Sequence, residues 1–226
     1  MIMSMCEENK RTGRSRPFVQ IAVSNWELYC SRCPAGKKNH KDYLKFLAGL
    51  ALGESIGKKR PNILILREKQ LLEQEYVELF MGLWEEVKKY GKKGTAMLIP
   101  HMYVLAARQA GCGLLHLPLP LLREYRNQGR LSGLQTGTSI HSVQEAREAE
   151  KLGAAYVTAG HIFSTDCKKG VPPRDLEFLE QVCASVTIPV YAIGGIHEEH
   201  ISRIQKTKAA GVCQMSEYML GSAAMK

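Results

Sequence analysis

Short runs of β-forming apolar residues alternate along this chain with longer runs whose apolar positions recur every three or four residues. Phe18 to Val23, Asn62 to Leu66 and Ile188 to Ile193 are runs of the first kind. Leu71 to Tyr90 is of the second kind and is expected to be a helix, with an apolar face formed by Leu72, Tyr76, Leu79, Leu83 and Val87. Apolar strands that are each followed by a helix are typical of a parallel sheet covered on its faces.

About eight such strand-and-helix units follow one another, which predicts an α/β fold, a single-domain (β/α)8 TIM barrel, over residues 17–226. A doubly wound open sheet is the alternative, but the Gly-x-Gly-x-x-Gly turn after its first strand is missing. Residues 1–16 contain Lys10, Arg11, Arg14 and Arg16 among few apolar residues and are predicted to be a flexible basic tail.

One helix has clear signals at both ends. Ser142-Val-Gln-Glu145 has the form of a capping box, in which the serine accepts a hydrogen bond from a first-turn N–H and the glutamate reaches back to the cap. Gly153 supplies a left-handed end to the same helix.

The net charge of the chain bears on which classes of ligand the protein can bind. The chain has 226 residues, with 31 Lys and Arg against 22 Asp and Glu, and a formal net charge of +9. Such a surplus attracts nucleic acid, anionic lipid or phosphorylated metabolites. No basic stripe with interleaved aromatic residues is evident, so nucleic acid is not an expected partner. No signal peptide or uninterrupted apolar span of membrane length is recognised either, which predicts a cytoplasmic protein without a membrane partner.

The chain has seven cysteines, an odd number, which favours reduced thiols. Cys30 and Cys33 have the CxxC spacing of zinc and redox sites. A structural zinc site needs four ligands, and His40 alone does not complete one. We interpret Cys30 and Cys33 as two cysteines in a loop.

In a barrel, functional residues lie at the carboxyl ends of the strands. Arg67 and Lys69 follow the second strand and share one face, with Glu68 opposite, which suits an anionic substrate. His141 directly follows the fifth strand, where an imidazole is placed for proton transfer. Carboxylates are nearly absent from these strand ends, so no metal and no cofactor are predicted.

Two glycines follow the predicted seventh strand. Gly194 and Gly195 let backbone N–H groups approach a phosphate, although a tight turn with positive φ explains the same pair.

Four segments carry a resemblance to a known family. They are Leu66 to Lys69, Gly137 to Ser142, Gly160 to Gly170 and Ile188 to Ile196. Over residues 17–221 the chain resembles the thiamine phosphate synthase/TenI superfamily, single-domain barrels of thiazole and thiamine biosynthesis. The stretch from Thr158 to Gly170 looks more like the thiazole tautomerase (TenI-like) branch.

The positions at which this chain differs from the synthase branch also favour the tautomerase branch. That branch has a glutamine where this chain has Ile65, an Asn-Asp pair where it has Pro100 and His101, and a further acid where residues 117–121 have none. The resemblance therefore implies an isomerase, a thiazole tautomerase that aromatises a carboxylated thiazole phosphate by a metal-independent proton shift.

The resemblance also implies the roles of individual residues. His141 would be the general acid and base, and Cys167 is either substrate-facing or an inert buried thiol. Arg67, Lys69 and Lys168 would bind the substrate, whereas Gly194, Gly195 and Ser216 would bind its phosphate. Glu217 after Ser216 would repel that phosphate unless its side chain turns outward.

Two alternatives remain open. One is a thiamine phosphate synthase, a transferase that couples a pyrimidine diphosphate to a thiazole phosphate with magnesium. The other is a barrel that binds thiazole or thiamine phosphate without turnover. The expected partner is a small phosphorylated thiazole, and a homo-oligomer is left open.

Overall fold

The computed structural model describes residues 17–33, 38–54, 59–165 and 170–220. Eight strands form one sheet in the order β3-β2-β1-β8-β7-β6-β5-β4. The strands are β1 (Val19–Val23), β2 (Ile63–Leu66), β3 (Met97–Pro100), β4 (Leu114–Pro118), β5 (Gln135–Ile140), β6 (Tyr156–Gly160), β7 (Val190–Ile193) and β8 (Gly211–Gln214).

A helix follows every strand, and two follow β1. The helices are α2 (Trp26–Arg32), α3 (His40–Leu52), α4 (Glu73–Tyr90), α5 (Val104–Ala110), α6 (Leu119–Asn127), α7 (Val143–Lys151), α8 (Asp175–Ser185), α9 (Glu198–Gln205) and α10 (Ser216–Leu220). The alternation of strand and helix and the parallel pairing confirm the predicted (β/α)8 barrel fold.

Two compact units make up the chain. The β5–β8 unit comprises Leu117–Cys213 with the described residues before Gln20, and the β1–β4 unit comprises Gln20–His116 with the described residues from Gln214 onward. The predicted boundary between a basic tail and the barrel stays a prediction, because residues 1–16 lie outside the described part of the chain.

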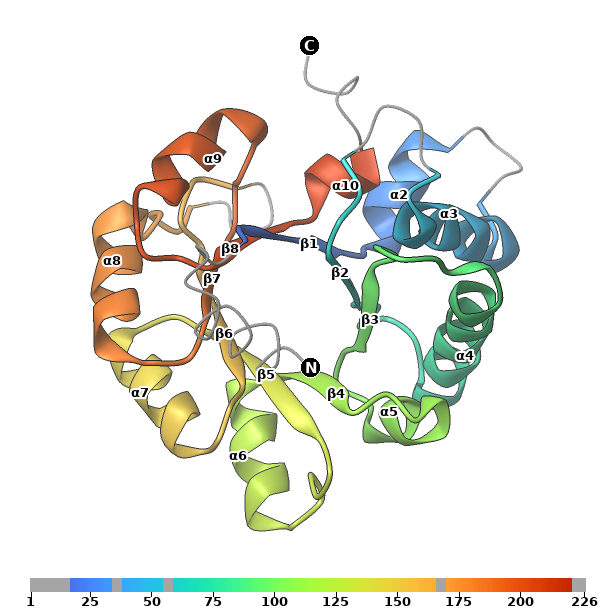
Figure 1. Ribbon diagram of the computed structural model, residues 1–226, viewed down its shortest axis with the longest axis horizontal. Helices are drawn as coiled ribbons and strands as arrows, with labels where there is room; N and C mark the ends of the chain where they lie inside the picture. Colours follow the sequence, from blue (N-terminus) through green and yellow to red (C-terminus); the bar gives the residue numbers. More distant parts are fainter. Residues whose placement is uncertain (1–16, 34–37, 55–58, 166–169, 221–226) are drawn as a thin grey trace. The chain divides into compact units, whose positions relative to one another are not determined.

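In the β5–β8 unit, α7 and α8 lie on the outer side of β5, β6 and β7 (Figure 1). Gly137 of β5 pairs with Tyr156 of β6, whose side chain is fully buried. A Cβ on Gly137 would lie 1.9 Å from the Tyr156 ring, so the strand pair requires glycine at this position. Glycine at position 137 therefore lets the Tyr156 ring lie directly against the backbone of β5.

In the β1–β4 unit, α3 and α4 lie on the same side of β2 and β3 (Figure 1). The hydroxyl of the buried Tyr76, on α4, donates to the Leu66 carbonyl at 2.6 Å and accepts from the His101 N–H at 2.7 Å. This one hydroxyl joins the carboxyl ends of β2 and β3, because it satisfies a backbone group of each.

The structure corrects the prediction that Cys30 and Cys33 lie in a loop. Cys30 lies within α2, and Cys33 is its C-terminal cap. The side chain of Asn25 caps the helix by accepting from the Leu28 N–H at 2.8 Å. None of the five described cysteines forms a disulfide.

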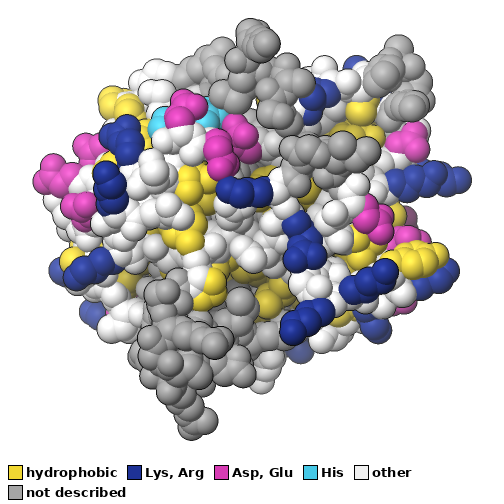
Figure 2. Space-filling model, turned by 45° about the horizontal axis from the view of Figure 1, so that its top comes forward, with side chains coloured by type: hydrophobic (Ala, Val, Ile, Leu, Met, Phe, Trp, Pro, Cys, Tyr) yellow, Lys and Arg dark blue, Asp and Glu magenta, His cyan; other side chains and the backbone are white. Residues whose placement is uncertain are grey.

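No helix within the described ranges is long and apolar enough to cross a membrane. On the face shown in Figure 2, Lys and Arg side chains are interspersed with Asp and Glu side chains and with apolar ones.

Candidate functional site

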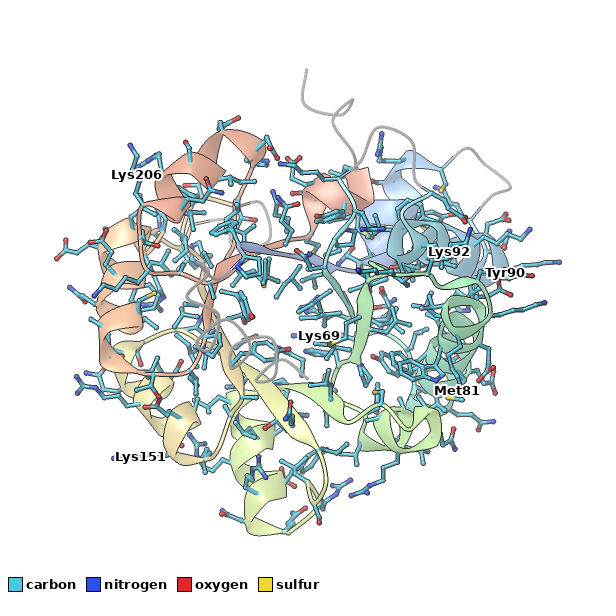
Figure 3. The ribbon with its side chains drawn as sticks, in the orientation of Figure 1. Lys69, Met81, Tyr90, Lys92, Lys151 and Lys206 are labelled. Carbon is cyan, nitrogen blue, oxygen red and sulfur yellow. The ribbon has the colours of Figure 1, made fainter. Side chains whose placement is uncertain are left out.

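The two cations predicted to bind an anion follow β2 directly. Arg67 is half-buried and Lys69 is exposed, whereas Glu68 between them is 2% exposed. Figure 3 shows the Lys69 side chain on the side of β2 and β3 that faces away from α4. The expectation that Glu68 lies opposite its two neighbours is confirmed.

Glu68 is held by four hydrogen bonds from α2, α3 and neighbouring residues. One carboxylate oxygen accepts from the hydroxyls of Ser24 and Tyr43. The other accepts from the Trp26 N–H and the Gln70 amide, both at 3.0 Å. Since Ser24 Oγ also accepts from the Arg67 N–H at 2.8 Å, this buried carboxylate fixes the backbone that carries Arg67.

Two buried histidines stand beside these cations. His101 directly follows β3 and forms a bridge with His116, the middle residue of β4; their ring centroids are 5.8 Å apart and their planes are inclined by 19°. The pKa of His101 lies well below its usual value. Burial is the largest cause, followed by the charges of His116, Arg67 and Lys69. Burial and the charge of Arg67 lower the pKa of His116 to about 3. Both imidazoles are therefore neutral at pH 7, and each has one N–H to donate.

Sequence reasoning did not identify this pair as a cluster. It considered His101 only at the position where the related synthases have an acid, and it gave His116 no role. The signal that could have revealed the pair was the predicted barrel itself. Its closure makes β3 and β4 neighbours, and neighbouring parallel strands bring their carboxyl ends together.

In the β5–β8 unit, His141 directly follows β5. Its Nδ1 lies 2.7 Å from the Gly160 carbonyl oxygen, and its backbone N–H donates to Glu145. A carbonyl only accepts, so the His141 Nδ1 carries a hydrogen and is the donor of this bond. The predicted capping box is confirmed at Ser142, which accepts from the Glu145 N–H at 3.0 Å. The Glu145 side chain, however, reaches past the cap to His141.

The two glycines after β7 adopt the positive φ of a tight turn, 98° at Gly194 and 63° at Gly195. A Cβ on Gly194 would lie 2.3 Å from the Cβ of His161, and one on Gly195 would lie 2.2 Å from the Ser164 carbonyl oxygen. The turn therefore packs directly against the residues that follow β6. Because His141 contacts Gly160, this packing brings His141 and the glycine turn to the same strand end.

Replacing Gly194 by alanine should destabilise the fold by about 1–3 kcal/mol, because the new Cβ meets backbone at an unfavourable φ. Urea unfolding measures the change. Gly113→Ala is the matched control, since nothing lies within 4 Å of the added Cβ. Equal stabilities of the two variants would contradict the close packing at Gly194.

The predicted site residues not yet placed are Ser216, Lys168 and Cys167. Ser216 begins the five-residue helix α10, in which Tyr218 and Met219 are buried. Ser216 and Glu217 are both partly exposed, and a phosphate-binding role for Ser216 stays a prediction. Lys168 and Cys167 lie outside the described residues.

No group of three or more His, Cys, Asp or Glu side chains in the described ranges is arranged to hold a metal ion. The buried carboxylate nearest in sequence to the cations, Glu68, already accepts four hydrogen bonds. The described residues therefore do not fit a magnesium ion held by carboxylates.

Residues 43–218 match the family model described as thiamine monophosphate synthase. The chain is 36% identical over 160 residues to the thiamine-phosphate synthase of Syntrophomonas wolfei, covering 68% of this chain and 73% of that protein. It is 32% identical over 183 residues to the putative thiamine-phosphate synthase 2 of Aquifex aeolicus, covering 81% and 93%.

Solved structures show the same fold. Thiamine phosphate pyrophosphorylase from Pyrococcus furiosus superposes with a TM-score of 0.68 at 24% identity, covering 91% of this chain and 89% of that chain. A 3-hexulose-6-phosphate synthase superposes with a TM-score of 0.58 at 16% identity.

These relatives correct the predicted activity. The relatives from S. wolfei and from Enterococcus faecalis, the latter 41% identical over 104 residues, are both named thiamine-phosphate synthase. The prediction of a thiazole tautomerase, and with it an isomerase, is therefore wrong, and the synthase held as its alternative is better supported. The family model and the similarity over most of both chains together show that this chain belongs to the thiamine monophosphate synthase family.

Proposed function

We propose that this chain is a transferase of the thiamine-phosphate synthase type, which joins a pyrimidine diphosphate to a thiazole phosphate and releases pyrophosphate. The observation that carries the proposal is the 36% identity to a thiamine-phosphate synthase over 73% of that protein's length. The family binds phosphorylated substrates, and a strand end with two cations beside two neutral imidazoles is suited to that class of ligand.

In the β1–β4 unit, we assign Arg67 and Lys69 to the diphosphate. Loss of pyrophosphate builds negative charge on the leaving oxygens, and fixed positive charges stabilise that charge as it develops. The hydrogen bond from the Arg67 N–H to Ser24 holds the backbone of Arg67 before the ligand arrives. Less reorganisation is then needed during the reaction.

In the β5–β8 unit, we assign His141, Gly194 and Gly195 to the thiazole phosphate. The coupling displaces a leaving group and does not require a proton to be moved between carbons. His141 is therefore assigned a binding contact through its ring, in place of the acid and base role first predicted. Ser216 belongs to the β1–β4 unit, and its predicted phosphate contact is left out of this assignment.

The family resemblance also implies magnesium at the diphosphate. Because the described residues do not fit such an ion, no step is assigned to it. A cytoplasmic location and a homo-oligomer stay predictions.

The direct test incubates the purified protein with pyrimidine diphosphate and thiazole phosphate and measures thiamine phosphate and pyrophosphate. Both products should form in equal amounts. His141→Ala should raise the KM for the thiazole phosphate about tenfold, as expected for one lost polar contact. Binding of both substrates without release of pyrophosphate would overturn the proposed activity.

A further inference from the structure

Helix α2 ends in a pair of cysteines that the proposed function does not use. Cys30 lies in the last turn of the helix, and Cys33 is its C-terminal cap. Both residues are partly exposed, and both are free thiols. Of the other described cysteines, Cys112 and Cys213 are buried, whereas Cys183 belongs to the β5–β8 unit. Among the described cysteines, Cys30 and Cys33 are therefore the two that share one helix end.

The two thiols lie close enough to influence each other and the same phenol. Burial is the largest cause of the raised pKa of Cys30, and the charge of Cys33 is the next. Burial also raises the pKa of Tyr29 well above its usual value, followed by Cys33, with smaller contributions from Asp42 and Cys30. Like charges have this effect over short distances. The two sulfurs and the Tyr29 hydroxyl thus form one group at the end of α2.

The backbone places the two cysteines within reach of a disulfide. Residues three apart on an α-helix have Cα atoms about 5 Å apart, and a disulfide accepts about 4.4–6.8 Å. The Cβ atoms of a disulfide are about 4 Å apart, closer than the about 5–6 Å between neighbours on a helix surface. Cys33 is able to close this difference, because it has already left the helical conformation, with φ −75° and ψ 135°. Its N–H donates to the Cys30 carbonyl at 3.3 Å, so only the end of the helix has to move.

We propose that Cys30 and Cys33 are a redox-active dithiol, which forms an intrachain disulfide by exchange with a small disulfide of the glutathione type. One cysteine thiolate attacks a sulfur of the small disulfide, whose S–S bond breaks and releases one thiol. The second cysteine attacks the resulting mixed disulfide, and a second thiol leaves. Overall the two cysteines lose two electrons and two protons, and the small disulfide takes them up as it becomes two thiols.

The second step is favoured because its thiol is held beside the mixed disulfide. An attack within one helix end needs no second encounter in solution, which raises its rate relative to attack by a free thiol. A disulfide that forms and is reduced again agrees with the free thiols of the structure, since disulfides in reducing compartments are commonly transient. The proposal does not depend on the coupling reaction.

Treatment of the full, native chain with excess glutathione disulfide at pH 8.5 tests the proposal, because more of each thiol is ionised there than at pH 7. Free thiols are then blocked with iodoacetamide, and the protein is digested with trypsin for mass spectrometry. Arg32 lies between the two cysteines, so trypsin cuts between them. In most chains the two peptides should stay joined, two hydrogens lighter than their sum, and dithiothreitol should separate them. Without glutathione disulfide, both peptides should be alkylated and separate.

Three variants serve as controls. Cys30→Ser and Cys33→Ser each keep one thiol of the pair, which should carry glutathione as a mixed disulfide and give no joined peptides. Cys183→Ser is the matched control, because it removes another partly exposed cysteine. It should leave the yield of joined peptides unchanged.

Two results in the wild type would overturn the proposal. One is glutathione attached to both Cys30 and Cys33 without joined peptides, and the other is a pair of thiols that stay free. A disulfide from Cys30 or Cys33 to a third cysteine would overturn it as well. The assay needs no turnover, so joined peptides together with a failed coupling assay would reject the proposed function alone. Successful coupling without joined peptides would reject the dithiol alone.

Discussion

Acidification from pH 7 to pH 5 is expected to lower the free energy of unfolding by about 2 kcal/mol through His116 alone. Burial lowers the pKa of this imidazole to about 3 in the folded protein. In the unfolded chain it titrates near its ordinary value of about 6.5, so the unfolded state binds more protons below that pH. Stability is therefore complete above about pH 6.5 and falls as the pH drops from there toward about 3.

His101 acts in the same direction, because its folded pKa also lies well below the usual value. Urea unfolding at pH 7 and pH 5 measures the total loss. His116→Gln removes one titrating group, so the difference in stability between the two pH values should shrink by about 2 kcal/mol relative to the wild type. The exposed His40 offers a matched control in His40→Gln. An identical pH dependence in the wild type and His116→Gln would show that His116 is not buried as a neutral group.

Much of the fold could be predicted from local patterns. The strand that ends before His141 and the helix that begins after Ser142 and ends before Gly153 follow from apolar periodicity and capping, which depend on near neighbours. Helix α2 was not predicted, because part of what holds it is packing against a separate helix. Its cap at Asn25 is local, but Trp26 and Tyr29 are held by packing on Tyr43, with ring centroids 5.1 and 4.7 Å away. Contacts between separate helices leave no periodic signal in seven residues.

The candidate site was predictable where a single strand end determines it. Arg67, Lys69 and His141 were found because a residue's distance from the end of its own strand can be read from the sequence. The His101–His116 pair depends on the register between two strands, which is set by tertiary packing. The activity was mistaken because the resemblance of Thr158 to Gly170 to the tautomerase branch, together with the acids missing at Pro100 and His101, was taken to favour a tautomerase over a synthase. In the structure, His101 lies there beside His116, and burial with the nearby charges of Arg67 and Lys69 holds its pKa well below the usual value.

Glu68→Ala should be among the most destabilising single substitutions in the β1–β4 unit, costing about 3–5 kcal/mol. The change leaves the hydroxyls of Ser24 and Tyr43 and the N–H of Trp26 without their acceptor. A buried donor without a partner costs about 1–3 kcal/mol, and these three donors are linked through one carboxylate. The matched control is Glu85→Ala, which truncates a glutamate side chain that is exposed to solvent on α4. It should cost less than about 0.5 kcal/mol.

Glu68→Gln separates the charge of the side chain from its role as an acceptor. Its amide oxygen can still accept from Ser24 and Tyr43, but its amide nitrogen would face the Trp26 N–H, a second donor. We therefore expect a loss of about 1–3 kcal/mol, intermediate between the wild type and Glu68→Ala. Pyrophosphate affinity should fall in Glu68→Ala under conditions where it remains folded, because the Ser24 hydroxyl that accepts from the Arg67 N–H loses its acceptor, whereas Glu68→Gln keeps that acceptor and should retain more of the affinity. Wild-type stability in Glu68→Ala would show that the four hydrogen bonds do not hold the end of β2, and the position of Arg67 would then need another explanation.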